Sequence, residues 1–436
     1  MGAETVVPQQ HGWPCRFPAT ASSRPPGADF EAIHLGWSST PPRREICYLA
    51  GVEIGVNDVS ECPVIASEER RRQFPLTEHY AYFNNAATGI VPVRTIEAMK
   101  EHWQTGAHPY GLGLDEPPQL SEEPRDRVAR FIGASREEVN FVSSTTHGLS
   151  IAATSFPLGP GDEVLIPERE FPSVVYPFLN QAEVRGFDVR FVAWEGFGPS
   201  LDELSSAMSE RTRMLCISWV QYQNGHTRDL QALGELCKER DIFLVVDAIQ
   251  GLGAIPLDVE GLGVDLLTAG TYKWLLSGPG NALLYVRRER IEHMRPAFAG
   301  YLAMTREVED PCYQLEFRKD AERFNLGSAN DAGIIALFHS LGLIEELGIA
   351  EINAHTRCLS RKLREGAIER GYIVNTREDE MSPIVAVTTG DLQRDEELLA
   401  HLMANRVHTC IRGMGLRLAP HFYCSDDDVQ RLLALL

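Results

Sequence analysis

Hydrophobic positions along this chain change their spacing at regular intervals from about residue 70 onward. Stretches in which apolar side chains recur every three or four residues indicate amphipathic helices, and they alternate with short runs of consecutive apolar residues. The runs are rich in Val, Ile and Leu and are bounded by turn residues, as is typical of strands covered on both faces. This alternation predicts an α/β fold with a mostly parallel central sheet.

The elements predicted up to about residue 325 form one large α/β domain. In such sheets, ligands collect at the carboxyl ends of the strands, so the residues that follow each strand are the first candidates for a site. Helices are predicted at 95–105, 124–133, 147–156, 173–186, 201–211 and 229–241, and strands at 138–144, 163–168, 188–194, 213–220, 242–248, 264–270 and 281–288.

After about residue 325 the helices lengthen and the strands become sparse, which predicts a smaller α+β C-terminal domain. The expected organisation is an irregular or disordered extension at 1–70, a large domain at 71–325 and a small domain at 326–436. Helices are predicted at 331–348, 351–371 and 426–436, and strands at 384–390 and 415–420.

The first 70 residues differ from the rest, because they are rich in Pro, Ser and Gly and show no period. The segment 48–56, "YLAGVEIGV", is expected either to form a strand or to pack on the body of the protein. An Arg-rich transit peptide and a misassigned start codon are alternative explanations, although Glu4, Asp29 and Glu31 argue against the transit peptide.

The charge and composition of the chain argue against some classes of binding partner. The chain has 436 residues and a net charge of −20, with 61 acidic residues against 41 Lys and Arg. An excess of acid argues against nucleic acid or an anionic membrane as a partner, because both need a basic face. No apolar run reaches the length of about 18 residues that a membrane span requires.

The cysteines predict a reducing compartment. Their number is odd and they are scattered through a long chain, without a CxxC pair or a Cys/His spacing that suggests a metal site. We therefore expect free thiols, no metal and a cytoplasmic protein. The nine cysteines are Cys15, Cys47, Cys62, Cys216, Cys237, Cys312, Cys358, Cys410 and Cys424.

Lys273 is one of only five lysines, and it lies between an apolar run and the glycine-rich turn "SGPGN". A lysine in such surroundings raises the question of how its charge is tolerated. Other chemically active residues follow neighbouring strands and are therefore expected at the same sheet edge. They are Asp247 and Gln250 after 242–246, Thr146 and His147 after 138–144, and Phe171 after 163–168.

Pyridoxal phosphate is a cofactor whose requirements match this set. It needs a lysine for a Schiff base, a carboxylate against its pyridine nitrogen and a flat side chain on its ring. It also needs a phosphate cradle, which hydroxyls and free N–H groups at a helix N-terminus supply. Gln250 would donate to the 3′-oxygen of the ring. Schiff-base formation also removes the charge of Lys273, which answers the question of its burial.

Each of these residues taken alone also has a plain structural explanation. Asp247 alone is more often a cap or a loop anchor, Phe171 alone is more often part of the core, and "TTHG" is more often a simple N-cap. Lys273 alone is more often a side chain that reaches solvent. Their joint occurrence in this order favours the cofactor site.

These segments resemble the class V aminotransferase family of fold-type-I pyridoxal-phosphate enzymes, which includes cysteine desulfurases, isopenicillin N epimerase-like proteins and kynureninases. The resemblance runs from about residue 80 to the C-terminus. It is most specific in "LVVDAIQGLGAIPLDV", "DLLTAGTYKWLLSGPG", "AERFNLGSAN" and "GLRLAPHFY". It implies the fold-type-I architecture, with a mostly parallel sheet in a large domain and a smaller α+β domain.

The resemblance also implies roles for single residues. Lys273 would be the Schiff-base lysine and Asp247 the partner of the ring nitrogen. Tyr272 replaces the histidine of desulfurases and is kynureninase-like. Ser328 would reach the phosphate of a neighbouring subunit, so a homodimer with shared sites is expected. The remaining cofactor-binding positions are Thr146, His147, Phe171, Tyr222, Gln250 and Thr271.

Two arginines match carboxylate-binding positions in different branches of the family. Arg417 in "LRLAPHFY" is the first choice and Arg412 in "CIRGMG" the second. A guanidinium fork suits an amino-acid carboxylate. Surface salt bridging is the alternative role for both.

The predicted function is a transferase that acts on an amino acid through an external aldimine, with transamination as the first candidate. C–S or C–C lyase chemistry and epimerisation are alternatives within the family. Persulfide-forming desulfuration is disfavoured, because 388–403 lacks the nucleophilic cysteine of desulfurases, and Cys410 is more simply a core residue. A lysine Schiff-base enzyme without pyridoxal phosphate and a non-catalytic binding protein are the remaining alternatives.

Overall fold

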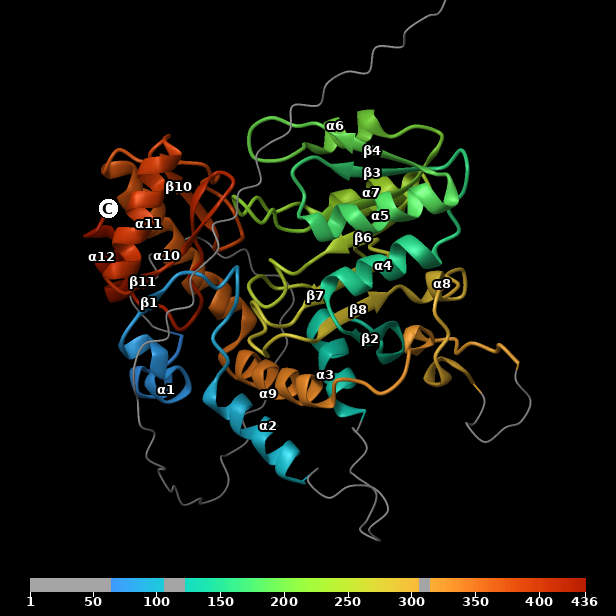
Figure 1. Ribbon diagram of the computed structural model, residues 1–436, viewed down its shortest axis with the longest axis horizontal. Helices are drawn as coiled ribbons and strands as arrows, with labels where there is room; N and C mark the ends of the chain where they lie inside the picture. The colour runs from blue at the N-terminus through green and yellow to red at the C-terminus, as the bar shows by residue number, and fades with distance from the viewer. Residues whose placement is uncertain (1–63, 106–121, 306–313) are drawn as a thin grey trace, which may run out of the picture. The chain divides into compact units, whose positions relative to one another are not determined.

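A seven-stranded sheet lies at the centre of the described part of the chain (Figure 1). The computed structural model describes residues 64–105, 122–305 and 314–436. Parallel pairing joins β4, β3, β5, β6 and β7, whereas β8 runs antiparallel to both β7 and β2. In spatial order the strands are β2 (Val139–Val142), β8 (Ala282–Val286), β7 (Leu266–Gly270), β6 (Phe243–Asp247), β5 (Thr212–Ser218), β3 (Glu163–Pro167) and β4 (Asp188–Val192).

Helices cover both faces of this sheet, as the apolar strands predict. In β6, Phe243 and Val245 face the hydrophobic cluster of α4 and α5, and Leu244 and Val246 face the cluster of α3, α7 and α9. This alternation follows from the two-residue period of a strand. The helices of this part are α2 (Val93–Thr105), α3 (Glu123–Ile132), α4 (Thr145–Ser155), α5 (Pro172–Arg185), α6 (Leu201–Ala207), α7 (Leu230–Glu239) and α8 (Arg288–Ile291).

Local signals in the sequence fix several helix ends. Ser144, Ser200 and Asp229 cap the N-termini of α4, α6 and α7, each through a side-chain oxygen that accepts from a first-turn N–H. Gly133 and Gly186 end α3 and α5 in the left-handed conformation that glycine adopts without strain. The capping of α4 matters most, because this helix starts at the candidate site.

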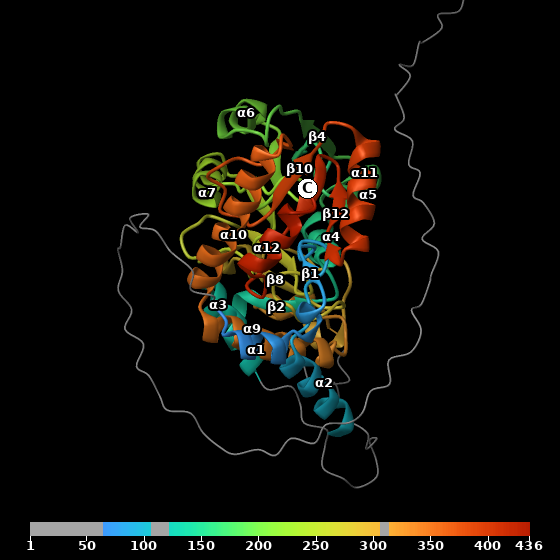
Figure 2. The ribbon, with the colours of Figure 1, turned by 90° about the vertical axis from the view of Figure 1, so that its left-hand side faces the viewer.

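A four-stranded antiparallel sheet lies in the C-terminal part of the chain, where Figures 1 and 2 show it beside α10, α11 and α12. Its spatial order is β12 (Cys410–Arg412), β13 (Gly415–Leu418), β10 (Val385–Thr388) and β9 (Ile373–Val374). The helices are α9 (Asp331–Leu347), α10 (Ile349–Glu369), α11 (Leu392–Ala404) and α12 (Asp426–Leu433).

Contacts between elements cross the predicted domain boundary at residue 325. Helix α9 packs against α2 and α3, and β1 (Ala81–Tyr82) pairs in parallel with β11 (Val407–His408). Helix α1 (Ser67–Gln73) likewise crosses the boundary predicted at residue 70. The described residues all fall within one unit, so the boundaries at 70 and 325 stay predictions. The candidate strand at 48–56 lies outside the described residues.

The predicted helices and strands from residue 95 onward are present, most with ends shifted by one to three residues. Helix α6 ends at Ala207, four residues before the predicted end, because the chain turns there to enter β5 at Thr212. The sequence pattern did not reveal α1, α8 or α11, nor the short strands β1, β9, β11 and β12.

Within the described residues, no single helix has the length and apolar character needed to cross a membrane. Helices α9 and α10 pass the test of length and composition only as a pair, and they are bent by 77° at their junction. Much of the apolar surface of α9 is instead buried in the core.

Candidate functional site at the carboxyl edge of the central sheet

Lys273 lies just beyond the end of β7 and is only 8% exposed. Residues 85–89, which precede α2, hold the backbone at Lys273 in place. Gly89 N donates to the carbonyl of Tyr272 at 2.9 Å, and Asn85 Nδ2 donates to the carbonyl of Lys273 at 3.4 Å. A Cβ on Gly89 would stand 2.1 Å from that Lys273 oxygen, so only glycine permits this approach.

Asp247 ends β6, the strand beside β7, and it is buried. The parallel register places it between Ser218 of β5 and Thr268 of β7. Its Oδ1 accepts a hydrogen bond from Ile249 N at 2.9 Å. The carboxyl ends of adjacent strands thus bring Asp247 and Lys273 to one edge of the sheet, as predicted.

Burial dominates the electrostatics of this pair. It raises the pKa of Asp247 to about 7, and the Ile249 N–H and the charge of Lys273 act against this rise. It lowers the pKa of Lys273 to about 8, against the effect of Asp247. Lys273 therefore holds its proton weakly, and the neutral amine is the form that attacks a carbonyl carbon.

The N-terminus of α4 is joined to the same edge. Gly270 N, at the end of β7, donates to Thr145 Oγ1 at 2.8 Å. Gly148 lets the helix approach the sheet, since a Cβ there would stand 2.3 Å from Thr268 Oγ1. First-turn N–H groups lack acceptors within the helix and favour an anion such as phosphate.

Thr146 and His147, the predicted phosphate ligands, lie in that first turn. Thr146 is exposed, and its Oγ1 donates to Ser173 Oγ at 2.8 Å. His147 Nδ1 lies 3.2 Å from Ser143 Oγ, and burial lowers the pKa of the imidazole. No role was predicted for Ser143, which directly follows β2, or for Ser173, which lies in the first turn of α5.

Three aromatic rings predicted for the cofactor site lie together, and two of them are close to the nitrogen of Lys273. Its Nζ lies 5.9 Å from the centroid of Phe171 and 5.7 Å from that of Tyr272. The rings of Phe171 and Tyr222 meet edge to face, with centroids 5.3 Å apart. Phe171 is 43% exposed, so part of its ring is available for stacking on a flat ligand.

A buried ion pair lies behind Phe171, and its role was not foreseen from the sequence. Glu170 Oε1 lies 3.3 Å from Arg228 Nη2, in an ion pair without hydrogen-bond geometry. Glu170 also accepts from the N–H and the hydroxyl of Ser218, and Arg228 Nη1 donates to the Ser218 carbonyl at 2.7 Å. The pair therefore fastens the residue before Phe171 to the strand beside Asp247.

Gln250 and Thr271 are buried at the site, but their side chains have other partners. Gln250 Nε2 donates to the carbonyl of Ala86 at 3.0 Å, and its Oε1 accepts from Trp274 Nε1 at 3.0 Å. Thr271 Oγ1 donates to the carbonyl of Asn281 at 3.0 Å. Gln250 retains one amide N–H for a ligand, whereas the hydroxyl of Thr271 anchors the turn after Lys273.

Arg417 and Arg412 differ in exposure. Arg417 is 2% exposed, and its Nη1 donates to the Tyr222 carbonyl at 2.9 Å. Its Nη2 contacts Cys410 Sγ at 3.7 Å, and its Nε has no hydrogen-bond partner among the described residues. Arg412 is exposed, and its Nη1 donates to the Ile411 carbonyl at 2.8 Å. Arg417 is thus a buried cation that has no carboxylate partner in the described part of the chain.

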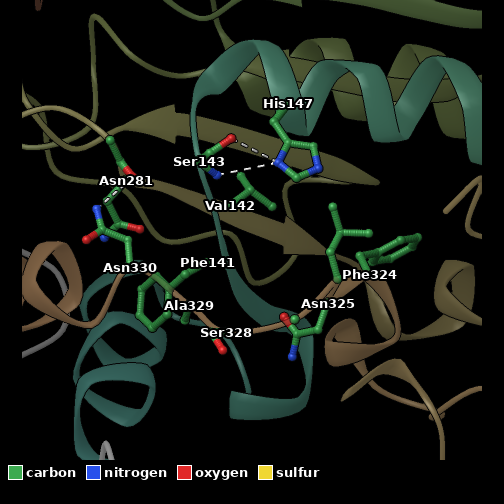
Figure 3. Close-up of a pocket in the computed structure, with 13 residues that line it drawn as sticks. Phe141, Val142, Ser143, His147, Asn281, Phe324, Asn325, Ser328, Ala329 and Asn330 are labelled. Atoms are coloured by element: carbon green, nitrogen blue, oxygen red, sulfur yellow. Dashed lines mark hydrogen bonds between the residues drawn. The ribbon is translucent and has the colours of Figure 1, made fainter. Parts of the chain in front are cut away.

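Ser328 lies with His147 along one cavity of about 290 Å³ (Figure 3). The two residues are far apart in sequence, and the structure brings them together within one chain. The residues that line this cavity include no Asp, Glu, Lys or Arg. They are Phe141, Val142, Ser143, His147, Gly280, Asn281, Phe324, Asn325, Leu326, Gly327, Ser328, Ala329 and Asn330.

The stretch 388–403, where desulfurases carry their nucleophilic cysteine, contains the end of β10 and most of α11. Asp391 caps the helix, and the buried Asp395 accepts from Thr388 Oγ1 and from the N–H of Thr389. Cys410 lies instead on β12, beside Arg417. It is partly buried, whereas a core cysteine was expected, and its Sγ accepts a contact from Arg417 Nη2 at 3.7 Å.

Comparison with known proteins identified related sequences and similar folds. The model of the aminotransferase class-V family matches residues 81–426. The protein named uncharacterized aminotransferase YcbU of Bacillus subtilis is 27% identical over 84% of this chain and 96% of its own length. The kynureninase of Shouchella clausii is 26% identical over 76% of this chain and 78% of its own. The apo structure of a cysteine desulfurase from Thermococcus onnurineus superposes with a TM-score of 0.77 at 24% identity, over 84% and 96% of the two chains.

Replacement of Asp247 by Asn is expected to change the pH dependence of stability. The folded pKa of Asp247 is about 7, above the ordinary value of 3.8, so its contribution to stability is full below 3.8 and is lost as pH rises through 7. Asn does not titrate, so Asp247→Asn should gain stability relative to the wild type as pH rises through this window. Urea unfolding of cofactor-free protein at several pH values measures this difference.

The exposed Asp202 on α6 provides the control for that experiment. Asp202→Asn removes the same formal charge from the surface and leaves the buried carboxylate of Asp247 unchanged. A difference between Asp247→Asn and wild type that stays constant with pH, or that matches the Asp202→Asn control, would contradict the assignment.

Proposed function

We propose that this chain, which belongs to the aminotransferase class-V family, is a pyridoxal-phosphate-dependent enzyme that transforms an amino acid, most simply by transamination. The carrying observation is the buried pair of Lys273 and Asp247 at the ends of neighbouring strands. Burial of a lysine and a carboxylate without a larger salt-bridge network is costly unless a ligand uses both. Their pKa values, displaced toward each other mainly by burial, are typical of a functional pair.

The side chains at this edge fit the cofactor. Asp247 would hold the ring nitrogen in its protonated form, and Phe171 would stack on the ring. The first turn of α4, with Thr146 and His147, would bind the phosphate. Gln250 has one N–H left for the ring oxygen.

When bound, pyridoxal phosphate supplies an aldehyde that condenses with amines and a ring that stabilises negative charge at the substrate α-carbon. Lys273 is the group placed to hold and move a proton at that carbon. Its lowered pKa, caused first by burial, suits a base that works near neutral pH. The ring centroids of Phe171 and Tyr272 lie 5.9 and 5.7 Å from its nitrogen, and Tyr222 packs on Phe171.

Arg417 supplies the substrate carboxylate site in this proposal. Its guanidinium is buried beside Tyr222, and it lacks a carboxylate partner among the described residues. Burial lowers the pKa of Arg417, so an anion opposite it would be strongly favoured. A planar guanidinium binds a carboxylate through two parallel hydrogen bonds, which also orients the α-carbon.

Transamination is the first candidate reaction, and C–C or C–S bond cleavage is the second. The second is favoured by similarity to a kynureninase and by Tyr272, which replaces the histidine of desulfurases. Persulfide chemistry is less favoured, because the stretch 388–403 contains no cysteine and most of it is helical. Assays of keto acid, sulfide and ammonia distinguish these reactions, and sulfide released with a protein-bound persulfide would refute this order of candidates.

The proposal places the enzyme in a reducing, cytoplasmic compartment as a homodimer. The five cysteines in the described part of the chain are free thiols, which supports that compartment. Three large apolar side chains are exposed in this region: Phe298, Tyr301 and Leu326, the last of which is two residues before Ser328. Apolar side chains gathered near a site are typical of a surface that another subunit covers.

Lys273→Ala is expected to abolish the visible absorbance of protein-bound cofactor and to reduce turnover by several orders of magnitude. Alanine has no amine for the Schiff base and no proton to transfer. Spectra after addition of pyridoxal phosphate and sodium borohydride trapping measure the covalent link. The exposed Lys238 on α7 is the matched control, and Lys238→Ala should retain the wild-type spectrum. A Lys273→Ala protein with full turnover would refute the proposed function.

Arg417→Lys is expected to lower kcat/KM for the amino acid by roughly 100-fold, mainly through a higher KM. Lysine keeps the charge but cannot form the two-pronged contact of a guanidinium. Steady-state kinetics measure the effect, and thermal unfolding checks that the variant is folded. Unchanged KM in a folded variant would remove Arg417 from the substrate site.

Mixed dimers of Lys273→Ala and Ser328→Ala chains test whether Ser328 acts across a subunit interface. If it does, a mixed dimer contains one site with both native residues, and activity per remaining Lys273 returns to the wild-type value. If Ser328 instead acts beside His147 of its own chain, the site with the remaining Lys273 lacks the Ser328 hydroxyl and keeps the Ser328→Ala defect. Light scattering measures the mass, and a monomer at working concentration would contradict the shared site.

A further inference from the structure

Arg412 and Arg417 lie on the same face of the C-terminal sheet. The antiparallel register of β12 and β13 pairs Cys410 with Arg417 and Arg412 with Gly415. Paired residues share a face, and so do residues two apart on one strand, so Cys410, Arg412 and Arg417 point the same way. The pair between them, Ile411 and Leu416, faces the hydrophobic core, in which Leu416 is buried. Diagonal neighbours of this kind are separated by roughly 7 to 8 Å at their Cα atoms.

The loop after β5 lies beside both arginines. The Tyr222 carbonyl accepts from Arg417 Nη1, and the Tyr222 hydroxyl accepts from Gln223 Nε2 at 2.9 Å. Gln223 in turn packs on the turn that follows Arg412, where a Cβ on Gly413 would stand 2.6 Å from its Cδ. The residues after β5 therefore contact the guanidinium of Arg417 and the turn that follows Arg412.

Neither arginine forms an ion pair with a carboxylate in the described part of the chain. Arg417 contacts a carbonyl and a thiol, and Arg412 contacts the carbonyl of Ile411. The nearest acids of the site already have partners, since Glu170 is held by Arg228 and Ser218. Two unpaired guanidinium groups on one face are unusual in a chain with 61 acidic residues and a net charge of −20.

Both arginines also act on Lys273. Burial is the first cause of its lowered pKa, and the charges of Arg417 and Arg412 lower it further. Arg412 is therefore close enough to the reacting centre for its charge to be felt there, although its side chain is exposed. A second anion bound at Arg412 would offset this positive potential.

We propose that the substrate is an amino acid with an acidic side chain, whose α-carboxylate binds Arg417 and whose side-chain carboxylate binds Arg412. This inference rests on the proposed function, because it assumes that Arg417 takes the α-carboxylate. The buried arginine then binds the group that all amino acids share, and the exposed arginine at the mouth selects the side chain. Cys410 lies between them with a side chain small enough to leave room for the ligand.

The test compares acidic amino acids with their uncharged isosteres on the holoenzyme. L-aspartate is paired with L-asparagine, and L-glutamate with L-glutamine, so that size is matched and only charge differs. We expect kcat/KM to favour one acid over its amide at least tenfold in the wild type. Arg412→Gln should reduce that ratio by roughly 10- to 100-fold, the range of one charge-assisted hydrogen bond.

A binding measurement separates recognition from chemistry. Calorimetry with succinate and glutarate, which have no amine to react, should give a Kd that rises about tenfold in Arg412→Gln. Butyrate, with one carboxylate, should show little change in this variant. Arg394→Gln, on the exposed face of α11, removes the same charge elsewhere and should leave both the ratio and the Kd unchanged.

The inference and the proposed function fail in different ways. If amino acids are turned over through Lys273 but Arg412→Gln changes acids and amides equally, the acidic substrate class is wrong and the proposed function stands. If Arg394→Gln has the same effect as Arg412→Gln, the effect is one of net charge and the site is wrong. If Lys273→Ala retains activity, the proposed function itself is wrong.

Discussion

The burial of Lys273 beside Asp247 is the constraint on which the rest of this site depends. Each charged group loses hydration worth several kcal/mol when it leaves water, and the attraction between the two recovers only part of it. Their pKa values therefore move toward each other, chiefly because of burial. The strands fix where the groups stand, and Gly89 and Gly148 let the neighbouring segments press against the strand ends. A site built this way is ready for a ligand that uses a neutral amine and a carboxylate together.

A second buried pair supports the first. Glu170 and Arg228 are both enclosed, and Ser218, which bonds to both, is the register neighbour of Asp247. The charge of Glu170 contributes to the raised pKa of Asp247, after the larger effect of burial. Removal of either partner would leave an uncompensated charge, which is typically worth about 3 to 5 kcal/mol of destabilisation, as much as many whole domains can tolerate. The position of Phe171 thus depends on an ion pair formed by the residue before it in the chain.

The elements and site residues that depend on local sequence pattern could be predicted from the sequence. Buried parallel strands are continuous apolar runs, so their ends, and with them Asp247 and Lys273, could be located from the sequence. The pairing of Glu170 with Arg228 could not, because it joins residues that are far apart in the chain and neither has a distinctive neighbourhood. Likewise, α11 was not predicted, and only Asp395 and Leu402 of its side chains are buried. The partners of Gln250 and Thr271 are set by tertiary contacts with Ala86, Trp274 and Asn281, which no spacing rule reveals.

Charge is distributed unevenly between the body of the protein and its site. The chain as a whole repels anions, yet the groups around Lys273 include Arg412 and Arg417, whose charges are not matched by acids on their own face. An acidic surface around a positive pocket slows the approach of an anionic ligand but does not weaken contacts made inside, where screening by solvent is small. The two effects act on different steps, because the outer field changes the rate of association and the buried guanidinium changes the rate of release. In the proposed site, Arg412 is exposed and Arg417 is buried, so an incoming anion would meet the exposed cation before the buried one.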